Sequence, residues 1–211
     1  KEALELRDGD SAFMGKGVIK AVNNINNLIS PLLKNLNPED QELIDKKLID
    51  LDGTDDKSNL GANAILAVSL AVSHVAAKKR NVSLHQHFHD VYSDITGLSV
   101  EPNLPMPMLN ILNGGEHADN NIDIQEFMII PFNASTFHEA MRWSSEIYWN
   151  LKNILKNKSL STAVGDEGGF APNLKSNEEA LTLILDAIKH SGLVPGKDVF
   201  LALDCAASEF F

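Results

Sequence analysis

Residues 199–204 read Val199-Phe200-Leu201-Ala202-Leu203-Asp204, an unbroken apolar run that ends in a carboxylate. A short continuous apolar run is typical of a strand that is buried on both faces. The residues before it fit a helix, because Ser176 and Glu179 match a capping box ahead of a helical pattern that reaches about Ser191. A buried strand that follows a helix favours the α/β class with a parallel sheet.

The same alternation extends back to Met108. The apolar runs Met108–Leu112 and Phe127–Ile130 predict strands, Thr162–Val164 predicts a shorter one, and Thr136 to Asn157 predicts a helix. About a dozen residues without a helical pattern separate the first two strands, which is short for a parallel crossover. We therefore expect these two strands to be antiparallel.

The residues before Glu101 have helical patterns instead. Pro102, Pro105 and Pro107 then form a stiff connector, so we divide the chain into domains 1–101 and 102–211. The expected helices are Val18–Leu32 with an end or kink near Ser30 caused by Pro31, one capped by Asn37 that ends near Asp52, Asn59–Lys79, and Leu84–Tyr92.

The composition excludes several classes of protein. With 18 Lys+Arg and 29 Asp+Glu the net charge is −11, and an acidic surface disfavours nucleic-acid binding. The single cysteine, Cys205, cannot form an internal disulfide, which favours a reducing compartment. We expect Cys205 to be a small core residue. Leu60–Ala77 is long enough to span a membrane but consists largely of alanine, so we expect a buried helix and no membrane insertion.

Polar groups flank the first two predicted strands. The paired glycines of Asn113–Asp119 allow backbone to approach a ligand closely, and His117 could then lie over the strand end, although an ordinary loop histidine fits as well. Gln125 and Glu126 begin the second strand. Antiparallel pairing would put them at the edge that carries His117, although a solvated strand start fits the spacing equally.

Two further acidic groups follow predicted strands. In Gly165–Gly169 two acids are bracketed by three glycines, more than a turn needs, which favours an aimed carboxylate over a simple Asx turn. Asp204 lies where α/β enzymes place metal ligands, or it caps the following segment. His85, His87 and His89 alternate, which on a helix points them to different faces, so we expect no metal cluster there.

Several long motifs resemble the enolase family, also called phosphopyruvate hydratase. Gly165–Asn173 reads GDEGGFAPN, which is similar to the signature of that family. The bacterial form of its NGG-x-HA…QEFM segment resembles Asn113 to Met128. Further similar segments are Leu201–Phe210, Asp8–Val18 and Leu51–Ala64.

The resemblance implies a partial enolase-type β/α barrel, preceded by the helical part of a smaller α+β domain. It implies a lyase of glycolysis that dehydrates 2-phosphoglycerate to phosphoenolpyruvate reversibly with Mg²⁺. Enolases combine a lysine or histidine base with one or two Mg²⁺. The resemblance also implies a cytoplasmic homodimer, with a side pool at the cell surface or secreted.

Residue roles carry over from the same motifs. Glu167 is implied as the general acid, Asp204 as a ligand of Mg²⁺, and His117 and Gln125 as substrate contacts. Glu126 would assist in catalysis and substrate binding, and its charge would raise the pKa of Glu167 so that Glu167 stays protonated.

The family's lysine base, two further metal acids and phosphate contacts have no counterpart in these motifs. We therefore expect a fragment, in which Phe210 and Phe211 lack the partners that would bury them. Two other interpretations stay open: a related enzyme that removes a proton beside a different carboxylate, and a non-catalytic interaction protein. The sequence on either side of the chain would distinguish them.

Overall fold

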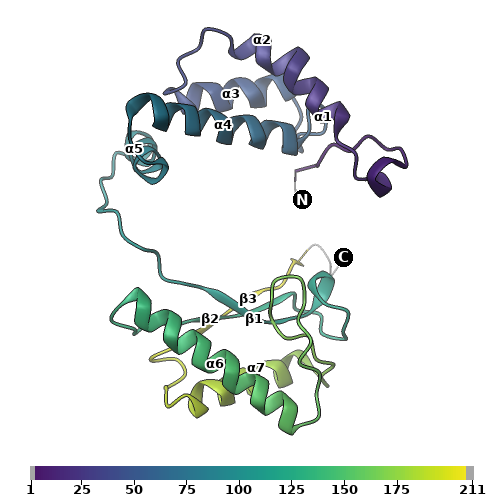
Figure 1. Cartoon of the computed structure of the whole chain (residues 1–211), viewed down its shortest axis with the longest axis vertical. Coiled ribbons are helices and arrows are strands. Elements are labelled where there is room, and N and C mark those ends of the chain that lie inside the picture. The colour runs from purple at the N-terminus through teal and green to yellow at the C-terminus, as the bar shows by residue number, and fades with distance from the viewer. Residues whose placement is uncertain (1–2, 208–211) are drawn as a thin grey trace. The chain divides into compact units, whose positions relative to one another are not determined.

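The computed structural model describes residues 3–207, whose helices and strands are labelled in Figure 1. The chain divides into two compact units, Lys1–Pro102 and Asn103–Phe211, and each is described by itself. Phe210 and Phe211 lie outside the described residues. The helices of the first unit are η1 (Ala12–Gly15), α1 (Ile19–Asn24), η2 (Ile25–Ile29), α2 (Ser30–Leu33), α3 (Gln41–Asp52), α4 (Ala62–Arg80) and α5 (Leu84–Thr96).

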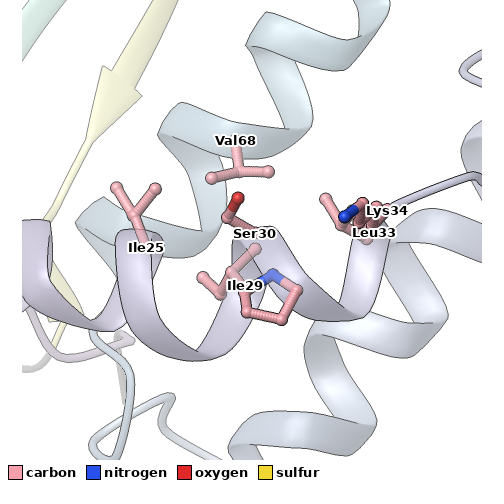
Figure 2. Close-up of a pocket in the computed structure, with 7 residues that line it drawn as sticks. Ile25, Ile29, Ser30, Leu33, Lys34 and Val68 are labelled. Carbon is pink, nitrogen blue, oxygen red and sulfur yellow. The ribbon is translucent and has the colours of Figure 1, made fainter.

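The first long helix continues past Ser30, where we predicted an end or a kink. It runs through α1, η2 and α2 to Leu33, and η2 is a π-helical turn. Proline lacks an N–H and its ring presses on the carbonyl group one turn earlier. A wide turn directly before Pro31 relieves that clash without ending the helix. Figure 2 shows this stretch, with Ile25 and Ile29 beside Val68 of α4.

Two other expectations for this unit were wrong. Asp40, not Asn37, caps α3, because the Asp40 carboxylate accepts from the N–H of Leu43, while Asn37 accepts from the Lys79 amine instead. Helix α4 is not buried throughout: Leu66 and Leu70 are 59% and 46% exposed. Among the described residues, no helix is long and apolar enough to cross a membrane.

The second unit is a small sheet with helices on it, so the α/β class is confirmed. Its elements are β1 (Leu109–Asn113), η3 (Gly115–His117), β2 (Glu126–Ile130), α6 (Phe137–Asn157), α7 (Asn177–His190) and β3 (Phe200–Asp204). The strand order is β1-β2-β3, and β2 is antiparallel to both neighbours. The predicted antiparallel pairing of the first two strands is thus confirmed, whereas no parallel pair of neighbouring strands occurs within residues 3–207.

The predicted strand Thr162–Val164 was also wrong. Val164 makes only an isolated bridge to Phe170, because the chain turns at once into the glycine loop. Cys205 is exposed and not a core residue, since it follows the last ladder position of β3.

Helices α6 and α7 supply the core of this unit. Ser176 caps α7 as predicted and Thr136 caps α6, each accepting from the N–H of a glutamate three residues later. The apolar faces of both helices pack with the sheet through side chains that are at most 4% exposed: Ile111, Leu112, Ile122, Phe127, Ile129, Ile147, Leu151, Leu155, Phe170, Leu174, Ala180, Leu183, Ile184, Ala187, Ile188 and Val199. This packing fixes the strand ends at which the polar groups gather.

Candidate functional site

Pairing of the strands brings three of the predicted residues to one edge of the sheet. Glu126 lies opposite Asn113 of β1 and opposite Asp204 of β3. The main chain of Gln125 links both neighbours, because its carbonyl accepts from Gly114 and its N–H donates to Asp204. The start of β2 and the ends of β1 and β3 therefore form one rim.

Glycines let the Gly165–Gly169 loop lie directly against that rim. A Cβ on Gly165 would collide with the carbonyl of His117, and one on Gly169 would collide with the Asn113 side chain. The N–H of Asp166 donates to the His117 carbonyl at 3.2 Å. The three glycines thus allow close approach and a turn, since Gly168 has a φ of +85°.

Helix α6 holds the same loop from the other side. The Tyr148 hydroxyl donates to the carbonyl of Gly168 at 2.8 Å, and its ring stacks on Phe170 with centroids 4.3 Å apart. Gly168 follows Glu167 directly in the chain, and Phe170 lies three residues after it. The loop backbone that carries Glu167 is therefore fixed by contacts on two sides.

The result is a pair of carboxyl groups beside an imidazole. Glu126 and Glu167 share a side-chain hydrogen bond. Nδ1 of His117 lies 3.4 Å from Oε1 of Glu126 and 3.7 Å from Oε1 of Glu167. The Asn110 amide of β1 donates to Oε2 of Glu167 at 3.2 Å. The structure thus brings His117 and Glu126 together, as the antiparallel pairing predicted, and Glu167 lies beside them, as the resemblance implied.

The pKa values of this pair are shifted in the opposite sense to our expectation, which was a raised pKa for Glu167. Burial is the main cause that raises the pKa of Glu126, and the nearby Glu167 and Asp204 add to it. Hydrogen bonds from Glu126 and Asn110 lower the pKa of Glu167. The physical reason is exposure: the Glu126 side chain is 15% exposed and that of Glu167 is 45% exposed, so the more exposed group takes the charge.

The raised pKa of Glu126 makes stability depend on pH. A carboxyl group whose folded pKa is raised stabilises the fold below its unfolded pKa, and that contribution is lost as pH rises through the folded pKa. Glu126→Gln keeps a donor toward Glu167 without a charge, so its melting temperature should exceed that of the unchanged chain at pH 7.5 and approach it near pH 4.5.

Glu139→Gln is the matched control for this melting experiment. Hydrogen bonds from Ser135 lower the pKa of Glu139, so this substitution should lower the melting temperature at pH 7.5. Equal pH dependence of Glu126→Gln and the unchanged chain would contradict the placement of the proton on Glu126.

The same group fits a metal ion in its donor chemistry. One ligand atom each from His117, Glu126 and Glu167 lies within 4.8 Å of the others. Nδ1 of His117 is buried without a hydrogen-bond partner among the described residues. Asp204 is not a member of this group, although it lies opposite Glu126, and its Oδ1 accepts from the N–H of Ala206. Carboxylate oxygens are the ligands preferred by hard cations such as Mg²⁺.

Comparison with protein families decides what this arrangement belongs to. The model of the enolase C-terminal TIM barrel domain matches residues 101–211, and that of the enolase N-terminal domain matches residues 1–88. The chain belongs to the enolase family. As an enolase-family chain it has the partial α/β fold expected of that family, and it is related to lyases that depend on metal.

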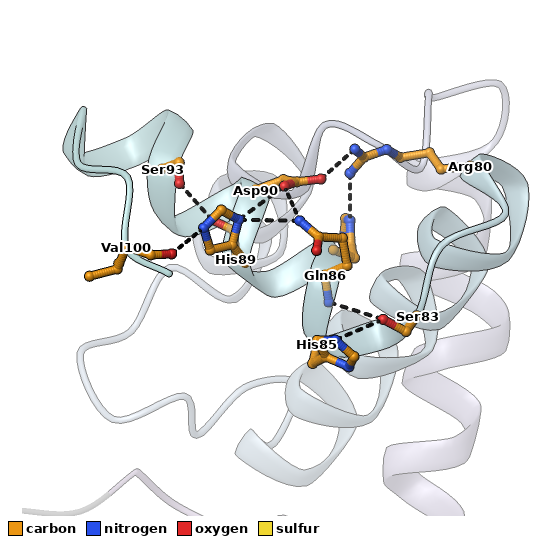
Figure 3. A network of polar contacts seen from close by, with 9 residues as sticks. Arg80, Ser83, His85, Gln86, His89, Asp90, Ser93 and Val100 are labelled. Atoms are coloured by element: carbon orange, nitrogen blue, oxygen red, sulfur yellow. Dashed lines mark hydrogen bonds and ion pairs between the residues drawn. The ribbon is translucent and has the colours of Figure 1, made fainter. Parts of the chain in front are cut away.

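His85, His87 and His89 belong to α5, and Figure 3 shows the contacts of His85 and His89. His89 contacts Asp90 and the carbonyl of Val100, His85 contacts the Ser83 hydroxyl, and His87 is buried. The metal-binding group found within the described residues includes none of these three histidines. The groove in Figure 2 is lined mainly by apolar side chains and offers no acid or imidazole.

Asn110 is the one site residue that sequence reasoning missed. It lies inside the apolar run Met108–Leu112, where we saw only a strand. A polar amide in a strand that is otherwise apolar needs a hydrogen-bond partner, which is the signal that could have found it.

Proposed function

We propose that this chain carries the acid side of an enolase reaction, the reversible dehydration of 2-phosphoglycerate to phosphoenolpyruvate. The observation that carries the proposal is the hydrogen-bonded pair of Glu126 and Glu167 beside Asp204 at one sheet edge. Family membership supports the reaction class. The lysine base and the remaining metal ligands would come from outside the 211 residues, so we propose that the chain is a fragment.

The acid pair suits a poor leaving group. Hydroxide leaves a carbon atom readily only if it receives a proton as the bond breaks. Glu167 is the more exposed carboxyl group and would give its proton to the departing oxygen. Glu126, whose pKa is raised, would first pass a proton to Glu167 through their shared hydrogen bond, and this is the proton that Glu167 gives to the departing oxygen.

His117 and Gln125 would position the substrate. His117 lies beside both carboxyl groups, and its carbonyl is tied to the N–H of Asp166. Gln125 is held by the main-chain hydrogen bonds on both sides that define the rim. Each residue therefore stands on fixed backbone next to the proton donor, as a positioned substrate contact requires.

Asp204, together with the metal ligands from outside the 211 residues, would hold Mg²⁺ at this edge. When bound there, the ion would offset the negative charge that develops on the substrate carboxylate as the neighbouring carbon loses its proton. Asp204 supplies a hard oxygen ligand at the end of a buried strand, where its backbone is fixed by the ladder with β2. We propose Mg²⁺ as the ion because Asp204 supplies a hard oxygen ligand and because the chain belongs to a metal-dependent family.

Substitution of Asp204 tests the metal assignment. Asp204→Asn retains an oxygen that can accept from Ala206 but removes the charge, so the fold should persist while affinity for Mg²⁺ falls by about tenfold or more. Asp198→Asn is the matched control, because Asp198 precedes β3 at its other end. Calorimetric titration of Mg²⁺ that gives equal affinities for the Asp204 variant and the control would refute the role of Asp204.

Two other functions compete with this proposal. A related enzyme could use the same edge on a different acid substrate, and a non-catalytic protein could keep the fold alone. The acid pair favours catalysis over the second, because two carboxyl groups in contact destabilise a fold unless they share a proton. Binding of 2-phosphoglycerate but not of other hydroxy acids would favour the enolase reaction over the first. We also propose, on the basis of family membership, that the complete protein is a cytoplasmic homodimer.

A further inference from the structure

Asn110 contacts the proton donor of the proposed reaction although it lies in the middle of a strand. Its Nδ2 donates to Oε2 of Glu167 at 3.2 Å, across a separation of 57 residues in the chain. It lies in β1 opposite Met128, directly before the irregular step in pairing between Asn110 and Leu112. The hydrogen bond therefore joins a fixed strand to the carboxylate at the tip of the glycine loop.

The rest of the Asn110 side chain has no structural partner. Its Oδ1 is buried and accepts from no donor among the described residues. A buried, unpaired acceptor destabilises a fold. If the amide turned over, Oδ1 would face the Glu167 carboxylate and the NH₂ group would lack its acceptor. Only the contact with Glu167 therefore explains a polar amide at this position.

We propose that Asn110 is a positioning residue that holds the Glu167 carboxylate toward the substrate. This inference rests on the proposed function. The neutral amide donates at every pH and adds no charge, so it can orient an acid without neutralising it. Glu126 contacts Glu167 as well, and the two donors together leave the carboxylate little freedom to rotate away. Asn110 itself takes no part in proton transfer.

Replacement by leucine separates positioning from structural support. Asn110→Leu has a similar volume and removes both the donor and the unpaired acceptor, so the chain should melt at the same temperature or higher. In the complete enzyme that carries this chain, kcat should fall by about tenfold or more while KM for 2-phosphoglycerate changes little. Asn110→Gln, which keeps an amide on a longer arm, should recover part of the lost kcat.

Asn133→Leu is the matched control. The Asn133 amide also donates to a carboxylate at 3.2 Å, that of Asp198, but at the opposite end of β2. This control should leave kcat unchanged. Equal kcat values for Asn110→Leu and Asn133→Leu, or a joint loss of kcat and melting temperature in Asn110→Leu, would overturn the positioning role.

A second measurement on the 211-residue chain does not depend on turnover. The side-chain NH₂ resonances of Asn110 should move in the NMR spectrum when Glu167 is replaced by alanine, whereas those of Asn133 should not. If the Asn110 resonances do not move, the hydrogen bond is absent and the inference fails. If they move but the complete enzyme does not act on 2-phosphoglycerate, the proposed function fails instead and Asn110 is not a positioning residue for that reaction.

Discussion

Glu167→Gln lowers the rate of 2-phosphoglycerate dehydration by about 100-fold or more in the complete enzyme, which is what a positioned general acid contributes. The amide cannot give a proton to the departing hydroxyl group. It can still accept from Asn110 and Glu126, so the glycine loop should keep its conformation. The loss should therefore appear in kcat, measured as phosphoenolpyruvate formation, without a loss of melting temperature.

Exchange of the carbon-bound proton is the internal control for this variant. That step uses the base and not the acid, so exchange of the substrate proton with solvent deuterium should survive better than dehydration. Glu126→Gln should also slow dehydration, because Glu126 is proposed to supply the proton that Glu167 transfers. Equal loss of exchange and dehydration in Glu167→Gln would assign Glu167 to the carbon proton instead and contradict the acid role.

The 211-residue chain alone shows no turnover and only marginal stability. Within residues 3–207 the sheet has three strands, whereas a closed β/α barrel has eight strands in a domain of about 250 residues. Within residues 3–207, β1 pairs with β2 and has only an isolated bridge to Phe170 on its other side, and β3 pairs only with β2, whereas each strand of a closed barrel has two neighbouring strands. Apolar side chains near these strands are also exposed, among them Phe132, Val164, Phe200 and Leu203.

This prediction has two separate readouts. Purified chain with Mg²⁺ and 2-phosphoglycerate should form phosphoenolpyruvate no faster than the metal-only blank. The reason is that the family's lysine base has no counterpart in the motifs of this chain. Its thermal transition should be broad and low. Turnover above the blank, or a sharp cooperative melt in a monomer, would show that the 211 residues are sufficient and that the fragment proposal is wrong.

Local patterns predicted most of the elements because they depend on short-range chemistry. Ser176 caps α7 as expected, α6 begins after Thr136 as expected, and α3 ends at Gly53 in the left-handed conformation. The short link between β1 and β2 also indicates the antiparallel pair, and this pairing alone predicts that His117 and Glu126 lie on one rim.

Features that depend on tertiary surroundings were not predictable in this way. The π-helical turn before Pro31 and the exposed face of α4 are set by packing, which periodicity does not report. Which of Glu126 and Glu167 has the raised pKa depends on their relative burial, and sequence spacing contains no information on burial. The contact between Asn110 and Glu167 joins residues far apart in the chain, so the polar amide in an apolar strand indicates that a partner is needed but not which residue supplies it.

The central claim is that one sheet edge holds the acid pair, the metal ligand and the substrate contacts. Mn²⁺ is a paramagnetic substitute for Mg²⁺ that broadens the NMR signals of nuclei near its binding site. Titration of the labelled chain with Mn²⁺ should first broaden signals from Asp204, Glu126, Glu167 and His117, and Asp204→Asn should weaken that effect. Broadening that begins instead around the acidic side chains of α3 or α5, or that is unchanged in Asp204→Asn, would contradict the claim.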